Sequence, residues 1–131
     1  MKQRIALLLV IPVVLSFSFF QSDSLPESVK RGKLVYEGNC ISCHMENGEG
    51  LEGAFPPLVK TSRLIDKKRL VKIIFNGLEG RITVSGKEYN NQMNPVALSE
   101  QEVTDVLNYI RNTWGNKHQP MKVSEIKELT K

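Results

Sequence analysis

Two cysteines and a histidine occur within five consecutive residues, in the order Cys40, Cys43, His44. Residues i and i+3 lie on one face of a helical turn, so both thiols can reach the same planar group. They could form thioether bonds to the two vinyl groups of one porphyrin, and the imidazole could bind the iron from that side. The spacing therefore predicts one covalently bound haem c, attached through both cysteines, with His44 as the proximal iron ligand.

Three other uses of these residues compete with haem attachment. Cys40 and Cys43 could form a disulfide, or a thioredoxin-like dithiol, although the latter needs a βαβ context that this region lacks. A zinc site would need four ligands, whereas the chain has two cysteines and two histidines, and His118 lies far outside finger-type spacing. We favour haem attachment over these alternatives.

A segment with two prolines, Pro56 and Pro57, follows the motif. Proline fixes an extended backbone at such positions. A metal-bound histidine normally donates its second ring N–H to a fixed acceptor, and a carbonyl in this segment is suitable for His44. The glycine-rich loop over residues 46–53 lacks the lysine and serine of a phosphate-binding loop, so it predicts no phosphate site.

A helix is expected to carry the chain from Ser24 to the motif. Ser24 and Glu27 have the spacing of a capping box, with Pro26 inside the helix start. Gly32 lowers the stability of such a helix, so its presence suggests close contact with a second helix. A tolerated surface glycine is the alternative explanation.

Further helical segments follow the prolines. Asp66 can cap a helix over residues 67–76, and Gly77 is a suitable terminator. The apolar face of this helix would consist of Leu70, Ile73 and Ile74. Residues 82–84 are predicted to form a short extended segment at most.

The last strong helix begins after Ser99, which forms a second capping box with Glu102. Its apolar positions recur at helical spacing, and Trp114 and Gly115 end it. Residues 117–131 form a charged tail. Apolar residues at three-residue spacing in this tail predict either a short docking helix or disorder.

The N-terminus has the pattern of a secretory signal. Lys2 and Arg4 precede a mainly apolar run over residues 5–20, and polar residues follow. We assign residues 1–22 to a signal peptide and residues 23–116 to one folded domain. The apolar run is short for a membrane-spanning helix, which needs about 20 residues, so an uncleaved anchor is the alternative.

The charge of the chain indicates no nucleic-acid partner. Without Lys2 and Arg4, the 18 basic residues become 16 against 14 acidic ones, a net charge of +2. Two haem propionates would bring this value near zero, so no strong steering field is expected.

These residues, in this order, resemble a class I monohaem cytochrome c over residues 26–115. The resemblance is greatest to cytochrome c subunits or domains that serve dehydrogenases, oxidases or copper nitrite reductases. It is carried by the attachment motif and by Gly32, Tyr36, Pro56, Leu58, Gly77, Leu78, Gly80, Tyr89, Met93 and the helix end Tyr109-Ile110-Arg111-Asn112-Thr113-Trp114-Gly115.

The resemblance implies an all-α cytochrome c fold in which the N- and C-terminal helices cross at a glycine and an aromatic residue. It also implies that the carbonyl of Pro56 accepts a hydrogen bond from His44, and that a methionine closes the distal side. Haem c is attached outside the cytoplasm in such bacterial proteins, so the resemblance implies an exported, periplasmic protein, or one anchored in the membrane and facing the periplasm.

Met93 is the expected distal iron ligand. Met1 lies in the leader, Met45 adjoins His44 and cannot reach the opposite face, and Met121 lies in the tail. Met93 follows His44 by 49 residues, enough chain for a helix and a return around the haem edge. The family usually has proline directly after this methionine, whereas Asn94 intervenes here. His118, Met121 or an open site remain alternatives.

With two axial ligands, the iron would only exchange electrons, so the predicted function is electron transfer and not catalysis. A haem enzyme or gas sensor with an open distal site is the alternative, as is a secreted dithiol protein without haem. Tyr36, Tyr109 and Trp114 are expected to pack in the core. Further expectations are propionate pairing or solvation for Arg81 and Arg111, and a redox partner that docks through a mostly uncharged patch around Ile41, Ala54 and Phe55.

Overall fold

A computed structural model describes residues 24–130 of the chain. The predicted signal peptide over residues 1–22 therefore lies outside the described residues. The elements are α1 (Leu25–Asn39), α2 (Ile41–His44), the 3-10 turn η1 (Ser62–Leu64), α3 (Lys67–Asn76), β1 (Ile82–Val84), β2 (Lys87–Tyr89), α4 (Glu100–Asn112) and α5 (Val123–Leu129). The helical fold is as predicted. In residues 24–130, the longest helix is too short and too polar to cross a membrane.

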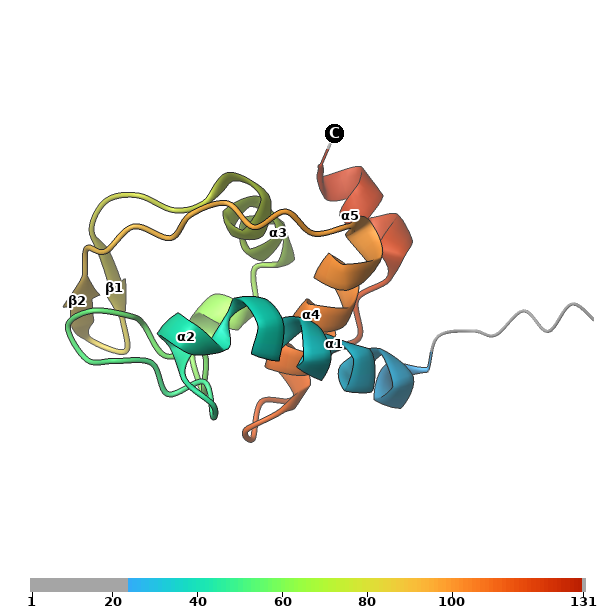
Figure 1. The fold of residues 1–131 in the computed structure, drawn as a ribbon, viewed down its shortest axis with the longest axis horizontal. Coiled ribbons are helices and arrows are strands. Elements are labelled where there is room, and N and C mark those ends of the chain that lie inside the picture. The colour runs from blue at the N-terminus through green and yellow to red at the C-terminus, as the bar shows by residue number, and fades with distance from the viewer. Residues whose placement is uncertain (1–23, 131) are drawn as a thin grey trace, which may run out of the picture.

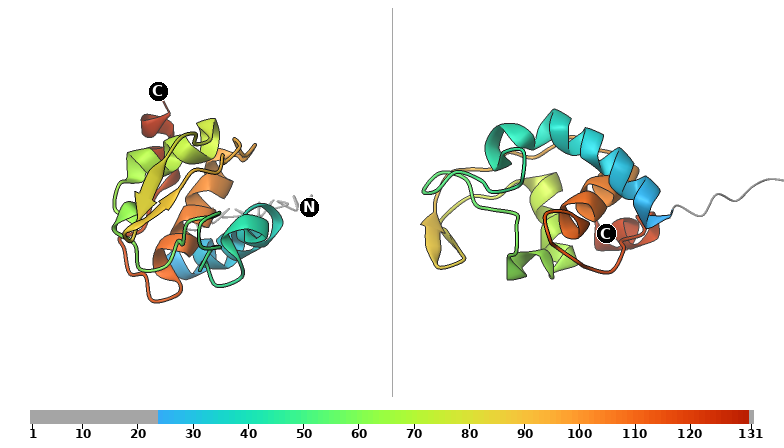
Figure 2. Two further views of the ribbon diagram at one scale, coloured as in Figure 1. Left: turned by 90° about the vertical axis from the view of Figure 1, so that its left-hand side faces the viewer. Right: turned by 90° about the horizontal axis from the view of Figure 1, so that it is seen from below.

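Helices α1 and α4 cross in close contact (Figures 1 and 2). Gly32 is buried at the crossing. A Cβ atom there would lie 1.9 Å from the carbonyl oxygen of Asp105 and 2.9 Å from Cβ of Tyr109. Only glycine permits this approach, so the close helix contact predicted from Gly32 is confirmed.

A buried polar network ties the two helices together beside this glycine. The carboxylate of Asp105 accepts a hydrogen bond of 2.6 Å from Ser28 and one of 2.7 Å from Nε of Arg31. Burial alone would raise the pKa of Asp105, but the hydrogen bonds donated by Arg31, Ser28 and Gln101 outweigh it and lower the pKa below its usual value. The carboxylate therefore stays ionised inside the interface, where it joins α1 to α4.

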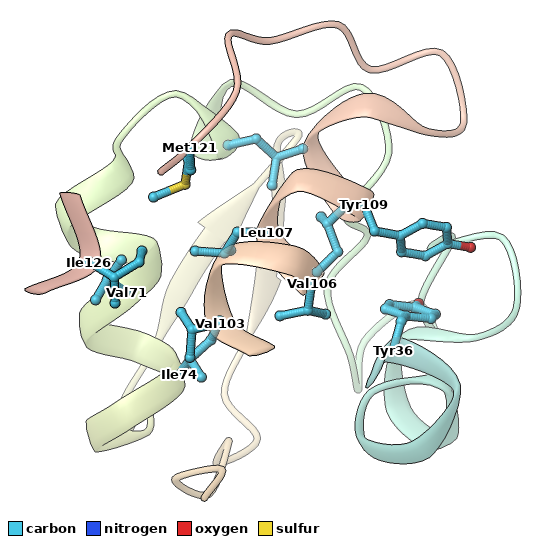
Figure 3. Close-up of a cluster of buried hydrophobic side chains, with 11 residues drawn as sticks. Tyr36, Val71, Ile74, Val103, Val106, Leu107, Tyr109, Met121 and Ile126 are labelled. Carbon is cyan, nitrogen blue, oxygen red and sulfur yellow. The ribbon is translucent and has the colours of Figure 1, made fainter. Parts of the chain in front are cut away.

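The hydrophobic core lies on both sides of α4 (Figure 3). One face of α4 packs on α3 through Val71 and Ile74, and another packs on Tyr36 of α1. The rings of Tyr36, Tyr109 and Trp114 form a triangle with centroid separations of 5.2–5.4 Å. The predicted packing role of these three aromatic residues is confirmed.

The helices begin with the caps that the sequence predicts, with one exception. Ser99 and Glu102 form the predicted capping box, and the Asp66 side chain accepts a 3.0 Å hydrogen bond from the backbone N–H of Arg69. The capping box predicted at Ser24 is wrong, because its side chain makes no capping hydrogen bond. Pro26 has no N–H, so it removes one of the donors that a cap would satisfy at this helix start.

Residues 82–84 pair with a second strand that was not predicted. Strands β1 and β2 form an antiparallel hairpin in which Ile82 lies opposite Tyr89. The turn consists of Ser85 and Gly86, with φ of 50° and 79°. Two positive φ values are typical of the tight turns that join short strands. Val84 and Tyr89 are buried, so the hairpin contributes a wall to the interior.

The C-terminal tail is a helix and packs on the same core. Ile126 of α5 has no exposed surface, and Met121 is also buried. The side chain of Asn108 forms two hydrogen bonds with the backbone of Met121, at 2.7 Å and 3.0 Å. Arg111 is buried and donates to the carbonyl oxygens of Leu64 and Gln119. Surface solvation, one of the two roles suggested for Arg111, is therefore wrong.

Candidate haem-binding site

The attachment motif occupies a tight turn directly after α1. The backbone N–H of Cys40 donates to the carbonyl of Tyr36 at 2.8 Å, and the N–H of His44 donates to the carbonyl of Cys40 at 2.9 Å. Both cysteines are free thiols. Burial, and then the nearby Cys43, raise the pKa of Cys40 to about 11, so its thiol is protonated at neutral pH.

The imidazole of His44 is oriented by a carbonyl of the proline segment. Its Nδ1 lies 2.9 Å from the carbonyl oxygen of Pro56. With Nδ1 donating its proton, Nε2 is left with a free lone pair for a metal ion. Burial lowers the pKa of His44, and the hydrogen bond to Pro56 offsets only part of this effect. The ring is therefore neutral at physiological pH, as a metal ligand must be.

The glycine-rich loop brings Pro56 to the histidine. The backbone N–H of Gly50 donates to the carbonyl of His44 at 3.0 Å, and that of Leu58 donates to the carbonyl of Gly48 at 2.7 Å. Gly50 has φ of 67°, and a Cβ atom there would lie 2.4 Å from the carbonyl oxygen of Phe55. Glycine is thus required where this loop passes the proline segment.

A largely apolar cavity with about 900 Å³ of empty space, part of it open to solvent, adjoins the motif. Cys40, His44 and Met93 line it, and so do apolar side chains of α3, the hairpin and α4. A second hollow is lined by the same three residues and by Cys43 and Phe55. Because the two share these walls, they lie next to each other, on either side of the same residues.

Met93 is held in place by the end of α3. Its backbone N–H donates to the carbonyl of Leu78 at 2.9 Å, and its carbonyl accepts from Leu78 at 2.8 Å. A Cβ atom on Gly77 would lie 2.5 Å from the Met93 carbonyl oxygen, so glycine is needed here for close approach. The intervening Asn94 is exposed and leaves this pairing intact.

The alternative distal ligands lie elsewhere. Met121 is buried in the core between α4 and α5, and neither it nor His118 lines the cavity in the part of the chain that the structure describes. Among residues 24–130, no three His, Cys, Asp or Glu side chains are grouped to hold a metal ion, which disfavours the zinc alternative. Arg81 also lies away from the cavity and forms an exposed ion pair with Glu88 at 3.2 Å.

The residues that line the cavity fit the chemistry of a haem. Its walls are mainly aliphatic, and a neutral imidazole, a thioether and the Cys40 thiol border it, with the Cys43 thiol in the adjoining hollow. Sequence periodicity found the apolar face of α3, but not that Leu70, Ile73 and Ile74 line this cavity. Arg63 and Arg69 also line it and were not predicted as site residues.

Comparison with known proteins finds cytochromes c, the class that the sequence resembles. The family model described as Cytochrome c matches residues 29–114. A cytochrome c-552 of Thermus thermophilus is 35% identical over 109 residues, covering 75% of this chain and 82% of the relative. The cytochrome c subunit of an alcohol dehydrogenase (quinone) from Gluconobacter oxydans is 34% identical, covering 65% of this chain and 18% of the relative. The CcoP subunit of a cbb3-type cytochrome c oxidase from Azospirillum brasilense is 32% identical, covering 69% of this chain and 30% of the relative.

Proposed function

We propose, since the chain belongs to the cytochrome c family, that it passes single electrons between two redox proteins through one haem c with histidine and methionine ligands. The family binds this haem covalently. When bound, the haem supplies an iron that alternates between the ferric and ferrous states. The protein residues attach the haem, fix its ligands and exclude water from its faces.

The observation that carries this proposal is that Cys40, His44 and Met93 border one apolar space. Cys40 and Cys43 would form the two thioether bonds. His44 would bind the iron through Nε2, because Nδ1 is engaged by Pro56. Met93 would be the second protein ligand of the iron and, as a soft ligand, would favour the ferrous state.

With both protein ligands bound, the iron would have no free position for a substrate or for oxygen. The proposed protein is therefore a carrier, or the cytochrome subunit of an oxidoreductase complex, and not itself an enzyme. An open-site haem enzyme or gas sensor would need a distal acid–base group. Among the described residues that line the cavity, His44 is the sole histidine, so this alternative has less support.

The proposed location is outside the cytoplasmic membrane. Residues 1–22 would act as a signal peptide, with retention as a membrane anchor the alternative, and residues 23–116 would form the haem domain. Mass spectrometry of the native N-terminus tests this assignment. A chain that begins near Asp23 supports cleavage, whereas an intact leader in the membrane fraction supports the anchor.

The proposed partner is a larger redox protein. Relatives of this chain include subunits of an alcohol dehydrogenase (quinone) and a cbb3-type oxidase, so we propose a dehydrogenase or oxidase, with a nitrite reductase as a further option. Ala54 and Phe55 are half-buried, and Phe55 lines the hollow beside Cys43. Leu51 is 51% exposed in the same loop and extends this docking patch. Ile41 packs against the core, so it contributes less than expected.

Haem staining tests the proposal most simply. After denaturing electrophoresis, the protein band should show haem peroxidase activity, because thioether bonds survive denaturation. A Cys40→Ala, Cys43→Ala variant should lose the stain. Ser42→Ala, which changes one of the two residues between the cysteines, should keep it. A double variant that still holds haem under denaturation would contradict covalent attachment at these cysteines.

Stopped-flow oxidation of the reduced protein by candidate acceptors tests the partner. Transient redox complexes bury less than about 1,200 Å². With an apolar patch and a small net charge, the rate should depend weakly on salt concentration. A steep fall with salt would point instead to the basic residues of α3, of which Lys68 and Lys72 are exposed. The other two residues suggested for this face, Lys67 and Arg69, are partly buried.

A further inference from the structure

We infer that Arg63 and Arg69 bind the two propionate groups of the haem, and that they hold both carboxylates ionised inside the protein. This inference rests on the proposed function. It replaces the roles first considered for Arg81 and Arg111, which lie away from the cavity.

The two arginines belong to the main cavity and not to the adjoining hollow that Cys43 lines. Arg63 lies in η1 and Arg69 in the first turn of α3, and both line the main cavity. Neither lines the adjoining hollow, where Cys43 is found. Because the vinyl-bearing and propionate-bearing halves of a porphyrin are opposite, attachment at the cysteines would turn the propionates away from the hollow and into the main cavity, which the arginines line.

Among the described residues, no acidic side chain pairs with either arginine. Arg63 donates one hydrogen bond of 2.8 Å to the carbonyl of Thr83, which is neutral and uses one of five N–H groups. The guanidinium of Arg69 has no hydrogen-bond or ion-pair partner among residues 24–130; its backbone N–H, not its side chain, is capped by Asp66. Both side chains are partly buried.

The remaining wall explains why such cations are needed. Apart from the attachment residues, Met93 and the two arginines, the main cavity is lined by aliphatic and proline side chains and by Thr61. Carboxylates placed against apolar walls would have raised pKa values and would take up protons. An adjacent guanidinium opposes this effect, and its planar fork matches a carboxylate with two parallel hydrogen bonds.

Arg63 also links this site to the hairpin. Its bond to Thr83 fixes β1, and the neighbouring Ile82 and Val84 line the cavity. A propionate held by the same guanidinium would therefore tie the hairpin, η1 and the haem together. Thr61 is buried, and its hydroxyl oxygen accepts a 3.3 Å hydrogen bond from the backbone N–H of Arg63. The Thr61 hydroxyl can still donate a hydrogen bond to a carboxylate.

The test compares the intact haem-loaded protein with its Arg63→Gln and Arg69→Gln variants. Arg81→Gln is the matched control, since it removes the same charge from an exposed position outside the cavity. The midpoint potential is measured against pH, from mildly acidic to neutral, and infrared difference spectra report the C=O band of a protonated propionic acid. Besides the two arginines, the titratable residues lining the main cavity are Cys40 and His44, which the variants leave unchanged.

The potential of the wild type and of Arg81→Gln should vary little with pH. Arg63→Gln and Arg69→Gln should have lower potentials, because loss of a cation favours the ferric state. Their potentials should fall as pH rises, because a propionate with a raised pKa then loses its proton within this range. The protonated-acid band should appear only in these two variants, and Arg63→Lys or Arg69→Lys should restore most of the wild-type potential.

Haem staining of each variant keeps the two proposals distinct. Absence of covalent haem from the wild type would overturn the proposed function and this inference with it. A stained protein whose Arg63→Gln and Arg69→Gln variants match Arg81→Gln, in potential and in infrared bands, would overturn the inference alone. A larger shift in potential for Arg81→Gln than for Arg63→Gln and Arg69→Gln would also overturn the inference.

Discussion

Replacing Gly32 by alanine adds a single methyl group at the crossing of α1 and α4. The new carbon would lie 1.9 Å from the carbonyl oxygen and 2.5 Å from the carbonyl carbon of Asp105. Normal contact between carbon atoms needs about 3.5–4.0 Å, so the two helices must move apart by more than about 1 Å. The obstructing atoms belong to backbone and cannot rotate away.

The cost follows from this overlap. Overpacking typically destabilises by about 1–3 kcal/mol, and the upper end applies because the backbone itself must shift. Alanine in place of glycine returns about 1 kcal/mol through its higher helix propensity. The net expectation for Gly32→Ala is a loss of about 2 kcal/mol in the free energy of unfolding.

Gly38 provides a matched control within the same helix. A Cβ atom there would meet no atom within 4 Å. Gly38→Ala should therefore stabilise the protein, by up to about 1 kcal/mol. Urea unfolding of the haem-loaded proteins, followed by circular dichroism, gives both values. If Gly32→Ala is as stable as the wild type, or shifts in the same direction as Gly38→Ala, the close-contact argument fails.

Three further changes test other parts of the fold. Asp105→Asn should lower the free energy of unfolding by about 1–3 kcal/mol. Because the pKa of Asp105 is lowered in the folded protein, this loss relative to wild type should be complete above the unfolded-state pKa and should shrink as pH falls through the folded pKa. A loss that does not change with pH would contradict this reasoning. Ile126→Ala should lower the free energy of unfolding in urea by about 2–5 kcal/mol, since the Ile126 side chain is fully buried. Glu128 is exposed on the same helix, so Glu128→Ala should change stability little. Equal unfolding midpoints for the two variants would mean that α5 does not support the core. Tyr36→Phe removes the 2.7 Å hydrogen bond to the carbonyl of Met45 and should lower unfolding stability by about 1 kcal/mol, and an unchanged stability would show that this bond contributes nothing net.

The helices were predictable because their signals are local. Capping by Asp66 and Ser99, and the apolar spacing of α3 and α4, depend on neighbours within one or two turns. Gly32 and the family resemblance together indicated where α1 and α4 meet, and the distance at that glycine agrees. The attachment motif is likewise a local pattern, so its three residues could be selected from sequence alone.

The second strand was missed because Lys87, Glu88 and Tyr89 show no run of apolar or β-branched residues. Its formation depends on the Ser85-Gly86 turn and on burial of Tyr89 against residues distant in sequence. Local pattern cannot supply such tertiary contacts.

The roles of arginines were also beyond local pattern. Arg111 can be buried because its side chain donates hydrogen bonds to the carbonyl oxygens of Leu64 and Gln119, which lie in two other segments. Arg63 and Arg69 reach the cavity because η1 and α3 fold back over it. In each case the residue type was consistent with solvent exposure, and only the path of the chain decided otherwise.

Ligation by Met93 is the central claim, and the ferric absorption spectrum tests it most directly. Sulfur-to-iron ligation gives a weak far-red charge-transfer band. The wild type and Met121→Ala, whose side chain is buried away from the cavity, should both show it. Met93→Ala should lose the band, have a lower potential and bind cyanide at the iron. Retention of the band in Met93→Ala, together with its loss in Met121→Ala or His118→Ala, would contradict the proposed site.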